Sequence, residues 1–85
     1  MHHHLKLMEE FEQAKLEGLK PWEFRSTVDR DFQVGDTVTF AVVSNDFQPW
    51  DRKPLGRSIG PVTITYVVSG GMLPPKSCIF THTQA

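Results

Sequence analysis

The sequence predicts an α+β fold in which one main helix covers an opening of a small curled β-barrel of about five strands. One segment near the start of the chain repeats its apolar residues at helical spacing. Five other segments have the short, alternating or β-branched pattern of strands. The 85 residues suffice for one small domain, and two tryptophans, one tyrosine and six phenylalanines supply bulk for its core.

The start of the chain predicts a short strand over residues 4–7 and a helix over residues 8–17. Acidic residues crowd the first helical turns and Lys15 lies near the end, as the helix dipole favours. Gly18 is a natural helix end, and Pro21 prevents the helix from continuing. The apolar stripe of this helix consists of Leu7, Met8, Phe11, Ala14 and Gly18.

The middle of the chain predicts two further strands. Residues 22–25 form the second strand, and a polar connection over residues 26–31 follows it. Gly35 and Asp36 mark a tight turn before residues 37–43, whose β-branched content is typical of a strand. The core face of this strand consists of Val38, Phe40 and Val42.

Residues 44–61 contain several prolines and glycines and predict a long loop. A strand follows over residues 61–68, and a short closing strand covers residues 77–81. We interpret residues 1–3 as a remnant of a purification tag and residues 82–85 as a frayed tail. The predicted faces of the strand over residues 61–68 are Val62, Ile64, Tyr66 and Val68 against Thr63, Thr65 and Val67.

Charge and composition exclude several classes of protein. A net charge of −1 argues against a protein that coats nucleic acid by bulk attraction, so a positive site has to be a local pocket. The single cysteine, Cys78, has apolar neighbours and is typical of a buried thiol in a reducing cytoplasm. Neither a membrane-spanning run nor a metal-ligand spacing is present. We therefore expect a cytoplasmic protein with no membrane partner, metal or cofactor.

The densest charges lie between residues 18 and 36, and residues 22–25 alternate aromatic and charged side chains. An extended strand with this pattern would bury Trp22 and Phe24 and hold Glu23 and Arg25 on the opposite face, beside Lys20.

Three interpretations of Lys20, Glu23 and Arg25 are open. Lys20 and Glu23 form an acid/base pair, since burial tunes the pKa of a lysine. Alternatively, the group binds an anion, with lysine as a point charge and arginine as a planar fork. The third interpretation is a structural ion-pair network at the edge of the sheet, which the spacing alone slightly favours.

Two motifs stand out in this region, and a shorter one follows. They are Gly18-x-Lys20-x-x-Glu23-x-Arg25, the run Asp29-Arg30-Asp31-Phe32-Gln33-Val34-Gly35-Asp36, and Gly56-Arg57. With these motifs the chain resembles the ASCH domains of the PUA-like superfamily, and more closely a short ASCH-like family common in phages and bacteria. The resemblance covers most of the chain.

The resemblance implies a PUA-like (ASCH-like) β-barrel with a ligand cleft, in a superfamily whose members mostly bind RNA or modified nucleosides. We therefore expect a small RNA- or nucleotide-binding module. The phosphate or a base edge would be contacted by Lys20, Arg25 and Arg57. Glu23 would accept a hydrogen bond from a base or orient Lys20. Arg30 would support the rim, and Trp50 and Trp22 would be stacking platforms.

Some superfamily members are hydrolases, including a small bacterial enzyme that removes the acetyl group from acetylated cytidine. That enzyme uses a lysine, a threonine three positions later and a glutamate from a later strand. Here the threonine position holds Glu23, and no glutamate follows the strand over residues 61–68. One alternative function is an amidohydrolase with Lys20 and Glu23 as catalytic pair. Another is a phage-type accessory protein that binds a host protein.

Overall fold

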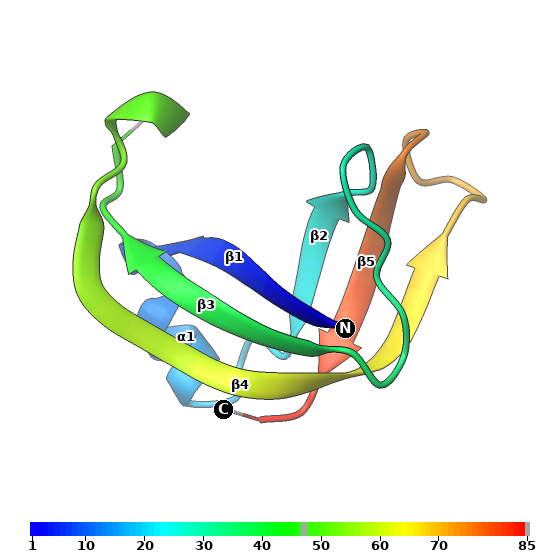
Figure 1. Cartoon of the computed structure of the whole chain (residues 1–85), viewed down its shortest axis with the longest axis horizontal. Coiled ribbons are helices and arrows are strands. Elements are labelled where there is room, and N and C mark those ends of the chain that lie inside the picture. The colour runs from blue at the N-terminus through cyan, green and yellow to red at the C-terminus, as the bar shows by residue number, and fades with distance from the viewer. Residues whose placement is uncertain (47, 85) are drawn as a thin grey trace.

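The computed structural model describes residues 1–46 and 48–84, which form five strands and one short α-helix (Figure 1). The strands are β1 (His2–Met8), β2 (Trp22–Ser26), β3 (Thr37–Val43), β4 (Pro54–Ser69) and β5 (Ser77–His82). The 3-10 turn η1 (Glu9–Phe11) and the helix α1 (Glu12–Leu16) follow β1, and the 3-10 turn η2 (Pro49–Asp51) precedes β4. The predicted α+β class is therefore confirmed.

The strands form one mixed sheet in the order β1-β3-β4-β5-β2. β1 runs parallel to β3, and the other neighbours are antiparallel. The sheet curls, as Figure 1 shows, but β1 and β2 stay at its edges, and the described residues form no ladder between them. The predicted barrel is therefore not closed, and the sequence prediction was wrong in this respect.

Two arginine side chains, one from β2 and one from the β2–β3 connection, donate to the open edge of β1 in place of a ladder. Arg25 of β2 donates from Nη2 to the carbonyl oxygen of Lys6 in β1 at 2.8 Å. Arg30 donates from Nη1 to the carbonyl oxygen of His4 at 3.2 Å. These bonds satisfy backbone groups that a neighbouring strand would otherwise take. We call the gap between the edges of β1 and β2 the seam.

The hydrophobic core lies on the inward face of the sheet. Val38, Phe40 and Val42 of β3 are at most 1% exposed, which confirms the predicted face of this strand. Cys78 is buried in β5 as predicted, and burial raises the pKa of its thiol. The other apolar members of the core are Leu5, Leu7, Phe32, Ile59, Val62, Ile64 and Phe80.

β4 begins inside the segment over residues 44–61 that the sequence predicted to be a loop. Its first half contains Pro54, Gly56, Gly60 and Pro61, residue types that are depleted in strands. At two register shifts β4 carries extra residues relative to β3, and such bulges accommodate glycine and proline. The loop prediction failed because a bulged strand has the composition of a loop.

A further register shift lies between Ile64 and Tyr66, where β4 pairs with β5. The sequence predicted that Val62, Ile64, Tyr66 and Val68 share one face. Val62 and Ile64 are 1% exposed, whereas Tyr66 is 63% and Val68 43% exposed. The prediction was wrong beyond Ile64, because one extra residue at the bulge reverses the face to which each later side chain points.

The helical segment is shorter than the predicted range 8–17. Met8 belongs to β1, the next turn is a 3-10 turn, and α1 ends at Leu16. No helix among the described residues has the length and apolar character needed to cross a membrane.

Both ends of the chain take part in the sheet. His3, interpreted from the sequence as part of a tag remnant, is buried in β1, and its Nε2 lies 2.8 Å from Oδ2 of Asp36. His82, expected in a frayed tail over residues 82–85, is buried at the end of β5. The backbone N–H of Thr83 donates to β4 at 2.9 Å, so the tail prediction does not hold at these two residues. Residue 85 lies outside the described residues.

Candidate functional site

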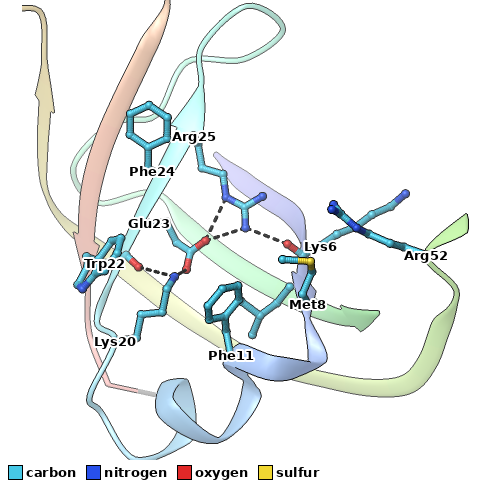
Figure 2. Close-up of a pocket in the computed structure, with 10 residues that line it drawn as sticks. Lys6, Met8, Phe11, Lys20, Trp22, Glu23, Phe24, Arg25 and Arg52 are labelled. Atoms are coloured by element: carbon cyan, nitrogen blue, oxygen red, sulfur yellow. Dashed lines mark hydrogen bonds and ion pairs between the residues drawn. The ribbon is translucent and has the colours of Figure 1, made fainter. Parts of the chain in front are cut away.

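Glu23 lies at the centre of an ion-pair cluster on the inward face of β2 (Figure 2). Lys20 donates to its Oε2 at 2.6 Å, and Arg25 donates to its Oε1 at 2.7 and 3.1 Å. Glu23 is 3% exposed, whereas Trp22 and Phe24 are 45% and 49% exposed. Glu23 and Arg25 do share a face as predicted, but the prediction that Trp22 and Phe24 face the core was wrong.

The reversal has a physical reason. A period-two pattern specifies which residues share a face, but it does not specify which face is inside. A buried carboxylate is tolerated when cations and hydrogen bonds compensate for its lost hydration. That condition is met here, since every buried side-chain nitrogen and oxygen in the described part of the chain has a hydrogen-bond partner.

Lys15 of α1 is the third cation of the cluster, and its side chain is fully buried. Its Nζ donates to Glu23 Oε2 at 2.6 Å and to the carbonyl oxygens of Lys20 and Trp22 at 2.8 and 3.2 Å. Burial lowers the pKa of Lys15, although the bonded Glu23 carboxylate opposes this effect. From the sequence, Lys15 is expected only as a cation near the end of the helix. Its position four residues after Phe11, on the same helical face, was the signal that could have identified it.

His82 of β5 completes the cluster behind Lys15. Its Nδ1 lies 2.6 Å from the carbonyl oxygen of Thr83, which only accepts, so Nδ1 carries the proton. Its Nε2 therefore accepts from Lys15 Nζ at 2.9 Å. Burial lowers the pKa of His82, as expected for a neutral ring beside a cation. The ring thus orients Lys15 without adding positive charge.

The charge balance of the cluster follows from the ionisation of Glu23. Burial by itself would raise the pKa of Glu23, but hydrogen bonds from Lys15 and Lys20 and the charge of Arg25 outweigh burial and lower the pKa to about 2. Glu23 is therefore ionised at neutral pH. Because three cationic side chains share this one carboxylate, positive charge is in excess beside the seam.

A pocket of about 340 Å³ opens at the seam beside this cluster (Figure 2). We call it the seam pocket. Its cations are Lys6, Lys20, Arg25 and Arg52, its aromatic residues are Phe11, Trp22 and Phe24, and its carboxylate is Glu23. Lys20 Nζ lies 4.5 Å from the centre of the Trp22 ring and 5.1 Å from that of Phe11, which are cation–π distances. The pocket therefore combines positive charge with aromatic surface.

A second pocket of about 190 Å³ shares Arg25 with the seam pocket. Arg30, expected at the rim of the ligand cleft, lines this second pocket and does not line the first. The other residues that line it are Leu5, Ser26, Asp29 and Phe32. Arg25 and Arg30 therefore lie in succession along the seam.

The structure does not bring Arg57 and Trp50 to the seam pocket. Arg57 of β4 pairs with Glu12 at 2.9 and 3.0 Å and with Glu9 at 2.9 Å, and hydrogen bonds to these carboxylates raise its pKa. Trp50 lies in η2, is 78% exposed and lines neither pocket. The predicted convergence therefore holds for Lys20, Glu23 and Arg25 but not for Arg57.

Arg52 supplies the cation that sequence reasoning expected from Arg57. It lies between η2 and β4, and its Nε donates to the carbonyl oxygen of Asp46 at 3.0 Å. No motif or spacing in the sequence connects Arg52 with Lys20. The β1–β3 ladder pairs Met8 with Val43, so the β3–β4 connection starts beside the end of β1.

Metal binding has no geometric support in the described part of the chain. No three His, Cys, Asp or Glu side chains within residues 1–46 and 48–84 gather closely enough to hold a metal ion.

Comparison with known proteins identifies the family of the chain. No curated protein matches the chain. The family model described as "Domain of unknown function (DUF3850)" matches residues 2–80, which includes β1 to β4 in full and the first part of β5. The chain therefore belongs to the DUF3850 family.

Proposed function

We propose that the protein is a small binding module for RNA or another nucleotide-like ligand, held in the seam pocket by Lys20, Arg25 and Arg52. The observation that carries the proposal is the lining of this pocket, with four cations and one carboxylate in a chain whose net charge is −1. A local excess of positive charge in a cleft raises the local concentration of anions.

The hydrogen bonds of Arg25 support a phosphate contact. Its Nε and Nη2 are held by Glu23 and by the Lys6 carbonyl oxygen. Its Nη1 donates to no group within the described residues, so its N–H groups remain for a ligand. An arginine fixed in this way is pre-organised for the planar, forked recognition of an anion.

The aromatic lining supports a base beside the phosphate. Phe11, Trp22 and Phe24 line the same pocket as the cations, and exposed aromatic rings are the usual stacking partners of nucleobases. The volume of about 340 Å³ falls in the range of small-ligand sites, roughly 300–1,000 Å³. A nucleotide is the ligand chemistry that uses both kinds of side chain.

The amidohydrolase alternative rests on the contact of 2.6 Å between Lys20 and Glu23. With a pKa of about 2, however, Glu23 is a weak base, and general-base catalysis at neutral pH is most efficient with a pKa close to 7. We therefore rank binding above hydrolysis. Incubation with acetylated cytidine separates the two, because turnover that Lys20→Met abolishes would favour the enzyme. No observation favours the third alternative, binding of a host protein.

Calorimetric titration with nucleoside monophosphates tests the proposal. Lys20→Met and Arg52→Gln should each weaken binding at least tenfold, since a hydrogen bond to a charged group contributes on the order of 1.5–3 kcal/mol and about 1.4 kcal/mol is a factor of ten. Arg57→Gln is the matched control, because it removes one positive charge outside the seam pocket and should leave affinity unchanged. Affinity should also fall as salt concentration rises. Equal losses in all three variants, or no binding at low salt, would refute the proposal.

A further inference from the structure

On the outward face of the sheet, β2, β5 and the last part of β4 form an exposed surface that extends beyond the seam pocket. In Figure 1, β5 lies between β2 and the last part of β4. The strand register places Trp22 beside Thr81 and Thr81 beside Tyr66, so these residues form one row across three strands. A second row consists of Phe24, Ile79 and Val68. We call these two rows the outer face.

The outer face is apolar, aromatic and open to solvent. Tyr66 is 63% exposed, Phe24 49%, Trp22 45% and Val68 43%. None of its residues carries a charge, and three of the four most exposed side chains are aromatic. Contiguous apolar surface on a small domain commonly marks a binding site.

The outer face is continuous with the seam pocket. Trp22 and Phe24 belong to the outer face and also line the pocket. The ammonium group of Lys20, whose Nζ lies 4.5 Å from the centre of the Trp22 ring, stands where the two surfaces meet. Cations therefore lie at one border of an aromatic sheet surface, which is the arrangement that a phosphate backbone with stacked bases requires.

Building on the proposed function, we propose that the protein binds single-stranded nucleic acid, with one nucleotide in the seam pocket and the following bases stacked on the outer face at Trp22 and Tyr66. Trp22 and Tyr66 lie two strand spacings apart, about 10 Å, so one base does not cover both rings. Bases of a duplex are already paired and stacked, and their flat faces are not available to aromatic side chains. The geometry thus selects single strands longer than one nucleotide.

Fluorescence anisotropy with labelled uridine oligonucleotides tests this inference, with mononucleotide binding measured in parallel by calorimetry. Affinity should rise at least tenfold from one nucleotide to six, since each stacked base contributes roughly 1–3 kcal/mol. Tyr66→Ser should weaken hexanucleotide binding about tenfold and leave mononucleotide binding unchanged. Trp50→Ser is the matched control, because Trp50 is an exposed aromatic residue that lies outside both surfaces. Val68→Ser is a second variant of the outer face, and a DNA strand of the same length tests the role of the ribose.

The outcomes separate this inference from the proposed function. Mononucleotide binding that depends on Lys20 but does not strengthen with length would overturn the inference and leave the proposed function standing. Equal binding of duplex and single strand, or equal losses in Tyr66→Ser and Trp50→Ser, would overturn the inference as well. Absence of binding to every nucleotide would overturn both. Self-association in sedimentation experiments that Tyr66→Ser abolishes would mean that a second copy covers the outer face instead.

Discussion

At the scale of the residue, Glu23 faces the interior while the aromatic residues on either side of it face solvent. Lys15, Lys20 and Arg25 neutralise its carboxylate, and the seam pocket gains the remaining positive charge. If the proposed function holds, the depth of each cation divides structural from binding roles. Lys15 is fully buried and structural, whereas Lys20 reaches the pocket with 16% of its side chain exposed.

This division predicts unequal losses of stability. Glu23→Gln should lower the free energy of unfolding by roughly 3 kcal/mol or more, because it leaves several cations without a counter-charge at a buried site. Lys20→Met should cost less, about 1 kcal/mol, because Glu23 keeps Lys15 and Arg25 as partners. Urea unfolding at neutral pH measures both values. A loss for Lys20→Met as large as that for Glu23→Gln would contradict the assigned depths.

At the scale of the element, β4 decides the shape of the molecule. Its bulges let a strand of 16 residues pair first with β3 and then with β5. The same bulges change which residues face inward, and this places Tyr66 and Val68 on the outer face. Gly60 stands at one of these bulges, with a φ of 112°.

Substitution of Gly60 should be more costly than substitution of Gly56. A Cβ at Gly60 would lie 2.7 Å from the carbonyl oxygen of Val38, so backbone has to move. Gly56 also has a positive φ, 75°, but nothing lies within 4 Å of its would-be Cβ. We expect Gly56→Ala to lower the free energy of unfolding by about 1 kcal/mol and Gly60→Ala to lower it by several kcal/mol. Thermal denaturation of the two variants side by side measures the difference, and equal melting temperatures would mean that the bulge can relax.

At the scale of the whole molecule, the seam pocket exists because the sheet curls without closing. A closed barrel would join the edges of β1 and β2 by a ladder, whereas the open sheet leaves room for Arg25, Arg30 and the seam pocket. Eleven buried residues form the core cluster within residues 1–46 and 48–84. Because this core is small, the buried ionic groups should contribute strongly to the stability of the fold.

The ionic groups predict acid sensitivity. The hydrogen bonds from His3 and the N-terminal amine lower the pKa of Asp36 from 3.8 to about 2, and burial only partly opposes them. The pKa of Glu23 is likewise lowered, from 4.5 to about 2. Both carboxylates therefore stabilise the fold above their ordinary pKa values, and that stability is lost as the pH falls from about 4.5 toward 2. At about 1.4 kcal/mol per pKa unit, Glu23 alone contributes on the order of 3 kcal/mol.

His82 also makes the fold less stable as the pH falls, and it does so at a higher pH than the two carboxylates. Its pKa is lowered from 6.5, so below this value the unfolded chain takes up the proton more readily and stability declines as the pH falls. Urea unfolding between pH 7 and about pH 3 should show a continuous decline, which Glu23→Gln flattens in its acidic part. An unfolding free energy that does not change over this range would contradict the assigned ion pairs.

Local sequence patterns predicted much of the fold, whereas the predictions that failed concern contacts between distant segments. The strand over residues 37–43 and its inward face were predictable because β-branched alternation is a local property. The shared face of Glu23 and Arg25 was predictable for the same reason. The orientation of β2 and the burial of Lys15 were not predictable, because they depend on partners in β5 that lie more than fifty residues away. The bulged half of β4 was not predictable either, because its composition is that of a loop and only its pairing with β3 makes it a strand.

The sequence by itself thus determined the α+β class, the position of most strands, the buried cysteine and the association of Lys20, Glu23 and Arg25. Periodicity and short-range charge spacing act within a few residues, so one chain suffices to infer them. Only the tertiary structure decided that the barrel stays open, that Arg52 and not Arg57 completes the pocket, and that Trp22, Phe24 and Tyr66 share a solvent face. These outcomes depend on strand register and sheet curl, which arise from contacts between distant segments and leave no local pattern.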